Sequence, residues 1–312
     1  MAGKNYLKQM DFGNEAADDV DDDELKSYFV TQEHFNIFLK ENKRLQIIKA
    51  KKGMGKSALI KWIGLAISEQ DENALVIKIR GSDLSRENFK LTNALIEPND
   101  YIQDWIVRLC AVVNRELARK INFAYRDDEI SLVESTEVQG FKERSLVSCL
   151  LERFRSILGK YQPTSTKEIN HHEILKRIES LDESKIWILI DDLDATFPNS
   201  NKEKVNIGSF FSACRYMIQD VKGVNFRVTL RSDVWPVIRR HDEAMDKIEQ
   251  YVSEIEWTEE DFKQILCRRI QTEFSDDFYG LDDDELLGKI FKPTVFWNEK
   301  QVPTYQVLYI LA

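Results

Sequence analysis

Residues 44–60 read RLQIIKAKKGMGKSALI, a short apolar strand pattern that runs into a glycine-containing loop and then into a helix pattern. Successive backbone N–H groups at the start of a helix form a cradle for anions, and glycines let the backbone approach a phosphate closely. The loop carries Gly53 and Gly55, and the helix pattern begins at Lys56 and Ser57. In such loops the lysine contacts the β- and γ-phosphates, and the serine hydroxyl ligates Mg²⁺. The segment therefore predicts a phosphate-binding loop for a nucleotide.

The match to the full pattern G-x-x-x-x-G-K-[ST] is relaxed, because Ala50 stands where the first glycine is expected. A relaxed match arises by chance in roughly a few per cent of chains of this length. The flanking segments favour function over chance, because residues 45–48 are typical of a buried parallel strand and residues 58–63 of a core-facing helix. We expect nucleotide contacts from the loop and the first helical turn, at Lys52, Gly53, Met54, Gly55, Lys56, Ser57 and Ala58.

The composition is ordinary for a globular protein, with 43% hydrophobic and 31% charged residues in a chain of 312. The net charge of −10 argues against a general nucleic-acid-binding surface and leaves only a local basic patch open. No apolar run approaches the ~20 residues that cross a membrane, and no signal-peptide pattern opens the chain. The four cysteines have no C-x-x-C spacing, which indicates reduced core residues and a cytoplasmic protein without a membrane partner. They are Cys110, Cys149, Cys214 and Cys267.

Strand and helix patterns alternate along much of the chain. Alternation of this kind predicts an α/β fold with a parallel sheet that is covered by helices on both faces. Thr258 has the residue type of an N-cap for the last clear helix. Strands are expected at about 44–49, 74–80, 186–190, 226–230 and 251–256, with helices at about 56–69, 207–220 and 259–272.

Three regions are expected. Residues 1–43 form an N-terminal region, in which the acidic stretch 14–25 is expected to be a solvated tail rather than a recognition segment, followed by a short helix. Residues 44–272 form the nucleotide-binding α/β domain. Residues 273–312 are expected to begin a C-terminal helical region of a longer protein, because the chain ends in an apolar run without a polar terminator.

A helical insertion is expected within the α/β domain, at about 85–180, because little strand character is present there. Apolar residues recur at helical spacing from Tyr101 to Leu117, and further helix patterns span about 141–159 and 168–180. The insertion either binds a partner or enlarges the core.

Residues 186–194 read IWILIDDLD, a buried strand pattern that ends in paired carboxylates. Ligands of open α/β sheets bind beyond the carboxyl ends of the strands, so these acids are expected at the depth of the phosphate loop. We expect Asp191 to hold Mg²⁺ and Asp192 to act as the catalytic base or to position water, with Asp194 a weaker candidate. The alternative is that these acids cap the following turn. Buried carboxylates are costly without a cation or hydrogen bonds, which favours the metal site.

Arg231 ends the next strand pattern and is expected at the same edge of the sheet. An arginine in that place contacts the γ-phosphate and reports its loss on hydrolysis. The alternative is an ion pair with Asp233 or another neighbouring acid. Four further arginines are candidates for arginine fingers toward a neighbouring subunit, with ordinary surface positions as the alternative. They are Arg239, Arg240, Arg268 and Arg269.

The segments AKKGMGKS, ILIDDLD and VTLRSD together resemble the Walker A, Walker B and sensor-1 elements of P-loop ATPases whose catalytic strand lies between the other two. Within that division, the acid pair and the strand-ending arginine are similar to STAND and KAP-type ATPases. The opening FG…DELKSYFV, with the strand and loop that follow, resembles a bacterial P-loop ATPase family associated with phage-defence genes. The resemblance covers about residues 10–272.

The resemblance implies a sheet of order 5-1-4-3-2 and a set of residue roles. Lys56 and Ser57 would bind phosphate and Mg²⁺, Asp191 would hold Mg²⁺, Asp192 would serve as the catalytic acid, and Arg231 would sense the γ-phosphate. The implied activity is hydrolysis of ATP, with ATP and Mg²⁺ as cofactors. The implied function is a molecular switch that controls a partner or fused effector in bacterial anti-phage defence, with a homo-oligomer or a separate effector protein as partner.

Two other functions stay open. In the first, ATP would be a structural ligand in a non-hydrolysing scaffold of a complex. In the second, the chain would be a loader or motor that acts on DNA, and the acidic net charge argues against this function. Adenine is favoured over guanine, because no guanine-reading N-K-x-D motif follows the acidic strand.

Overall fold

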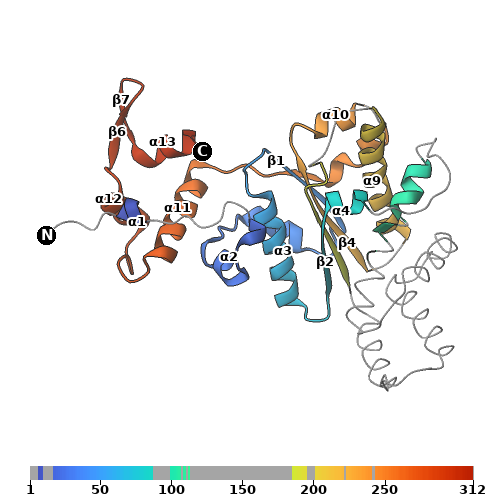
Figure 1. The fold of residues 1–312 in the computed structure, drawn as a ribbon, viewed down its shortest axis with the longest axis horizontal. Coiled ribbons are helices and arrows are strands. Elements are labelled where there is room, and N and C mark those ends of the chain that lie inside the picture. The colour runs from blue at the N-terminus through green and yellow to red at the C-terminus, as the bar shows by residue number, and fades with distance from the viewer. Residues whose placement is uncertain are drawn as a thin grey trace, which may run out of the picture.

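The structure is a computed structural model, and Figure 1 shows its fold. The parts of the chain that it describes are residues 6–9, 17–86, 99–106, 108, 109, 112, 185–194, 201–220, 223–240 and 243–311. Most of the predicted insertion lies outside the described residues, including the helices expected at about 141–159 and 168–180. Residues 99–106 are helical, in agreement with the start of the apolar stripe at Tyr101.

The centre of the fold is a five-stranded sheet in which every neighbouring pair of strands is parallel. Its order is β2-β3-β4-β1-β5, which is the predicted order read from the opposite edge. The predicted α/β fold with a parallel sheet is therefore confirmed. The strands are β1 (Leu45–Ala50), β2 (Leu75–Arg80), β3 (Ile186–Asp191), β4 (Val224–Arg231) and β5 (Val252–Glu254).

Helices cover both faces of the sheet (Figure 1). Side chains along β1 alternate between the faces, so that Ile47 packs into one apolar cluster and Ile48 into the other, and both are fully buried. One face is covered by α3 (Lys56–Gln70), α2 (Asp22–Tyr28) and the 3₁₀ helix η2 (Glu33–Leu39). The other is covered by α9 (Asn201–Asp220), α10 (Trp235–Arg239) and the helical residues 99–109 that are described.

The acidic N-terminal stretch is only partly a solvated tail, which corrects the prediction for residues 14–25. Val20 and Leu25 are buried in the cluster under α3. The carboxylate of Asp21 accepts the backbone N–H of Asp23 at 3.0 Å and caps α2. Acidic residues stabilise the first turn of a helix through its dipole. The acidic residues of this stretch therefore form the first turn of α2, and the apolar side of that helix packs inward. A short α1 (Tyr6–Gln9) and η1 (Ala17–Asp19) precede it.

The region after the sheet is more mixed than the predicted helical region. Thr258 caps α11 (Glu259–Glu273) in a capping box with Asp261, as predicted for Thr258. The chain then forms α12 (Asp283–Ile290), a hairpin of β6 (Thr294–Trp297) and β7 (Lys300–Pro303), and α13 (Thr304–Leu311). Asn298 and Glu299 turn the hairpin with φ of 47° and 62°, the left-handed pair that such tight turns require. This turn was not predicted from the sequence, and therefore the hairpin was not predicted either.

Further features of the described residues are the start of α9, the state of two cysteines and three short helices. Helix α9 begins at Asn201, six residues before the predicted start at about 207. Cys214 and Cys267 are buried and form no disulfide, as predicted, while the other two cysteines lie outside the described residues. Among the described helices, none combines the length and the apolar character that crossing a bilayer requires. The remaining elements are α4 (Gly81–Arg86), η3 (Glu243–Lys247) and η4 (Glu249–Tyr251).

Candidate functional site

The loop between β1 and α3 has the backbone conformation that its glycines predict. Gly53 and Gly55 adopt φ of 84° and 74°, in the left-handed region that glycine enters at little cost. The backbone N–H of Met54 donates to the carbonyl of Lys51 at 3.4 Å and closes the turn. No atom lies within 4 Å of a Cβ built at Gly53, so the need for glycine there comes from the backbone conformation and not from crowding.

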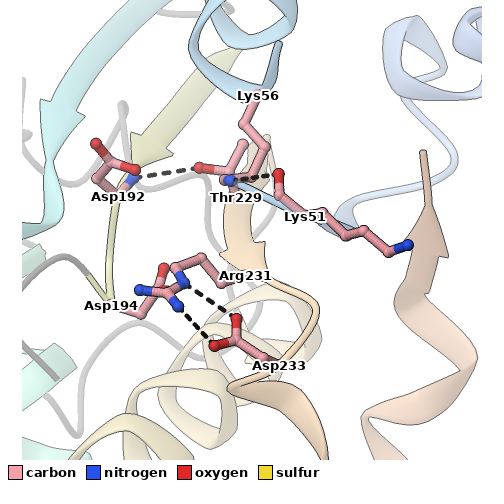
Figure 2. A network of polar contacts seen from close by, with 7 residues as sticks. All are labelled: Lys51, Lys56, Asp192, Asp194, Thr229, Arg231 and Asp233. Atoms are coloured by element: carbon pink, nitrogen blue, oxygen red, sulfur yellow. Dashed lines mark hydrogen bonds and ion pairs between the residues drawn. The ribbon is translucent and has the colours of Figure 1, made fainter. Parts of the chain in front are cut away.

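Lys56 opens α3 and folds back over the loop. Its ammonium group donates to the carbonyl of Lys51 at 3.2 Å, and the residue is only 8% exposed (Figure 2). Ser57 and Ala58 follow in the first helical turn and are partly exposed, while Lys52 is exposed on the loop. The predicted contact residues thus share one loop and one helix start.

Thr229 of β4 holds the acids that end β3. Its hydroxyl donates to the carboxylate of Asp191. Its oxygen accepts the backbone N–H of Asp192 at 3.2 Å (Figure 2). Thr229 is fully buried, so solvent does not reach its hydroxyl from the side of β4, although Asp191 is only half-buried and Asp192 is exposed. Asp192 has a φ of 51°, a left-handed conformation that Asp tolerates better than most residues. Sequence reasoning missed Thr229, although a hydroxyl in an apolar strand run is a visible signal.

Arg231, at the end of β4, pairs in register with Ala50 at the end of β1. Its guanidinium donates to both carboxylate oxygens of Asp233, at 3.0 Å and 2.6 Å (Figure 2). The ion pair that the sequence offered as an alternative is therefore present. The side chain of Arg231 is 42% exposed, and its pairing with Asp233 raises its pKa.

Asp194 lies on the inner side of Arg231. Its carboxylate is 3.8 Å from Nε of Arg231, the residue is only 2% exposed, and neither oxygen accepts a hydrogen bond from the described residues. Burial raises the pKa of the Asp194 carboxyl; neighbouring backbone amides and the charges of Lys56 and Arg231 oppose that rise without cancelling it. This carboxylate is thus a buried negative charge without full compensation.

The order of the strands brings these parts to one edge of the sheet. β4 lies between β1 and β3, and all three run parallel. Their carboxyl ends therefore carry, side by side, the glycine loop, Arg231 and the acid pair. Figure 2 shows Asp192, Arg231 and Lys56 from these three places together. The pKa of Asp233 is lowered chiefly by the hydrogen bond from Arg231 and to a smaller extent by the charge of Lys56, which also opposes the rise of the pKa at Asp194.

A pocket of about 380 Å³ lies beside the loop. The indole N–H of Trp257 donates to the carbonyl of Met54 at 3.0 Å and joins the loop to the segment before α11. Arg269 lies 4.4 Å from the ring centroid of Tyr28 in a cation–π contact. The pocket is lined by Tyr28, Phe29, Val30, Gly53, Met54, Gly55, Ala58, Trp257, Phe262, Ile265, Arg269 and Tyr309. Sequence reasoning missed it because its walls come from segments far apart in the chain.

Three of the four arginine-finger candidates have partners within the chain. Arg239 pairs with Glu249 at 2.7 Å, Arg268 donates to the carbonyl of Phe29 at 2.8 Å, and Arg269 packs on Tyr28. Arg240 is exposed.

The donor set fits a hard divalent cation only in part. The Ser57 hydroxyl and the Asp191 carboxylate are oxygen ligands of the kind that Mg²⁺ prefers. No cluster of three or more metal-ligating side chains occurs within the described residues. Mg²⁺ at nucleotide sites takes most of its ligands from phosphate and water, so two protein oxygens match this mode of binding.

The chain matches no protein-family model and no curated protein. Its class is therefore defined by the fold and the site. It is an α/β protein with a parallel sheet, in which a glycine loop, an acid pair and an arginine end three neighbouring strands.

Proposed function

We propose that this edge of the sheet binds Mg-ATP and hydrolyses it, and that the chain is an ATP-driven molecular switch. The observation that carries the proposal is the place of β4, which bears Thr229 and Arg231, between the loop-bearing β1 and the acid-bearing β3. A phosphate held by the loop would then have an acid pair and an arginine on the adjoining strand ends.

Each side chain has a role that suits its chemistry. Lys56 and the loop N–H groups would bind the phosphates, and Arg231 would contact the γ-phosphate. Ser57 and Asp191 would hold Mg²⁺, which neutralises charge on the β- and γ-phosphates when bound. Asp192 would orient or activate the attacking water. The two hydrogen bonds of Thr229, one donated to Asp191 and one accepted from Asp192, support these last roles, because they fix the strand end from which both acids project.

The pocket beside the loop supports a nucleoside ligand. Its volume of about 380 Å³ lies within the range of small-molecule sites, and its walls are largely aromatic and apolar. Aromatic rings such as Phe29, Trp257 and Phe262 offer surfaces on which a planar base packs. Since the loop residues Gly53 to Gly55 form part of its wall, a base in the pocket and phosphates on the loop would belong to one ligand.

The output of the switch is proposed on the resemblance to STAND and KAP-type ATPases. A partner or fused effector, a homo-oligomer and a role in anti-phage defence all rest on that resemblance. A physical link that suits a switch runs from the loop through Trp257 to α13, because Tyr309 donates to the carbonyl of Trp257 at 2.9 Å.

The proposal is tested by phosphate release from ATP. The wild-type chain is expected to hydrolyse ATP in the presence of Mg²⁺, and Asp192→Asn is expected to bind ATP while its turnover falls by about two orders of magnitude or more. Exposed Glu249→Gln serves as the control and should keep full turnover. Undiminished turnover in Asp192→Asn would remove Asp192 from its role. Tightly bound nucleotide without any release of phosphate would favour the scaffold function. Turnover that DNA stimulates and that salt reduces would favour the DNA loader.

A further inference from the structure

Arg231 binds the carboxylate of Asp233 with the same forked geometry that an arginine uses to bind a phosphate. Nε and Nη2 donate to the two oxygens of Asp233 at 3.0 Å and 2.6 Å, a forked arrangement that matches carboxylate and phosphate alike. These two N–H directions are therefore taken by Asp233. A γ-phosphate that used the same fork would have to displace this carboxylate.

Asp233 also lies within the positive field that a γ-phosphate needs. Its pKa is lowered, first by the hydrogen bond from Arg231 and further by the charges of Arg231 and Lys56. The residue that holds Arg231 is thus also attracted by the lysine of the loop. Its negative charge would repel a γ-phosphate that approached Lys56 and Arg231, so carboxylate and phosphate would compete for the same two cations.

The ion pair between Arg231 and Asp233 is exposed and therefore weak enough for a ligand to displace. The side chain of Asp233 is 63% exposed and that of Arg231 is 42% exposed, and exposed ion pairs of this kind contribute little to stability. Asp194 lies 3.8 Å from Nε on the buried side. It would keep the base of the guanidinium near the site while the fork changes partner.

We propose that Asp233 stands in for the γ-phosphate: it holds Arg231 when ADP occupies the site and releases it only to a nucleoside triphosphate. The inference rests on the proposed function of the site. Binding of a triphosphate then includes the cost of breaking the Arg231–Asp233 pair, and binding of a diphosphate does not. Asp233 thereby sets the discrimination between the two nucleotides and gives the switch an element with two defined arrangements.

The test is the affinity of the full chain for two probes, the β,γ-imido analogue of ATP and ADP, each with Mg²⁺. Asp233→Asn keeps the size of the side chain and removes its charge. We expect it to tighten binding of the ATP analogue by about two- to fivefold, the range of an exposed ion pair, and to leave ADP binding unchanged. Glu249→Gln breaks the similar exposed pair with Arg239, 2.7 Å long, with the same change in net charge. It is expected to change neither affinity.

A second pair of variants shows whether the gain passes through Arg231. In an Arg231→Ala background, Asp233→Asn is expected to give no gain for the ATP analogue. Equal tightening for both nucleotides, no tightening, or a gain that persists without Arg231 would overturn the role of Asp233. A wild-type chain that binds neither nucleotide would overturn the proposed function itself, so the two failures are distinguishable.

Discussion

The hydroxyl of Thr229 donates a hydrogen bond to the carboxylate of Asp191 across the boundary between β4 and β3. The same oxygen accepts the backbone N–H of Asp192. One buried side chain thus fixes both acids of the pair relative to the strand that carries Arg231. The geometry of the candidate site depends on a residue that would itself contact neither nucleotide nor metal.

Thr229→Val keeps the shape of the side chain and removes its hydroxyl. We expect the free energy of unfolding to fall by about 1–3 kcal/mol, because the half-buried carboxylate of Asp191 and the N–H of Asp192 lose their partner. ATP turnover is expected to fall about tenfold or more, since Asp191 and Asp192 lose their alignment. Thr229→Ser retains the hydroxyl and should restore most of the turnover. Denaturant unfolding and phosphate release measure the two effects, and equal activity in the Val and Ser variants would contradict the positioning role.

Asp194→Asn tests the buried carboxylate through its pH dependence. Because burial raises the pKa of Asp194 in the folded chain, its ionised form destabilises the fold at pH values above that pKa. As the pH falls through the raised pKa, the folded chain takes up a proton and the penalty disappears. The Asn variant should therefore be more stable than wild type near neutral pH, and this advantage should vanish below about pH 4. An advantage independent of pH, or one that Asp246→Asn shares, would contradict this account.

Arg227 is a charged residue in the middle of the sheet and is fully buried. It donates to the carbonyl of Lys40 at 3.0 Å and to that of Phe38, and its guanidinium lies 4.6 Å from the ring centroid of Trp187. Burial lowers the pKa of Arg227 to about 9, which still leaves it charged at neutral pH.

Arg227→Met is expected to lower the free energy of unfolding by about 2–4 kcal/mol, because the carbonyls of Phe38 and Lys40 at the end of η2 lose a charged donor while the apolar stem is kept. The exposed Arg239→Met should change it by no more than about 0.5 kcal/mol. Urea denaturation of both variants measures the difference, and a near-neutral effect of Arg227→Met would show that the clamp on η2 is not needed.

Gly81 tests the close approach of β2 to the turn after the acid pair. A Cβ built there lies 2.3 Å from Cα of Leu193 and 2.8 Å from the carbonyl oxygen of Asp192, both backbone atoms that have little room to move. Gly81→Ala should lower the free energy of unfolding by about 1–3 kcal/mol and reduce ATP turnover with it. Gly288→Ala, with nothing within 4 Å in helix α12, should be neutral or stabilising. Similar thermal unfolding of the two variants would contradict the crowding at Gly81.

Much of the sheet was predictable, because local residue patterns determine where its strands lie. Apolar runs such as 186–190 set the strands within one or two residues, and the alternation of strands and helices indicated parallel pairing. The start of α11 was predictable because Thr258 is a residue type that caps helices with its own side chain. The order of the strands depends on contacts distant in sequence, and it came instead from the resemblance of the loop, acid and arginine motifs.

The parts that escaped prediction depend on partners far apart in the chain. Nothing near Asp191 in the sequence points to Thr229, 38 residues later. Trp257 meets the loop at Met54 across 203 residues, so its pocket has no local pattern. The hairpin at Asn298 was missed for a different reason, since its turn lacks the glycine that usually marks one.

The central claim is that the loop and the neighbouring strand ends bind Mg-ATP, and calorimetric titration of ATP with Mg²⁺ tests it most directly. The wild-type chain should bind ATP at one site, and Lys56→Ala should weaken that binding at least about tenfold, because a charge-assisted contact to phosphate is lost. Control Arg239→Met should bind as the wild type does. No binding by the wild-type chain, or equal affinity in Lys56→Ala, would contradict the account.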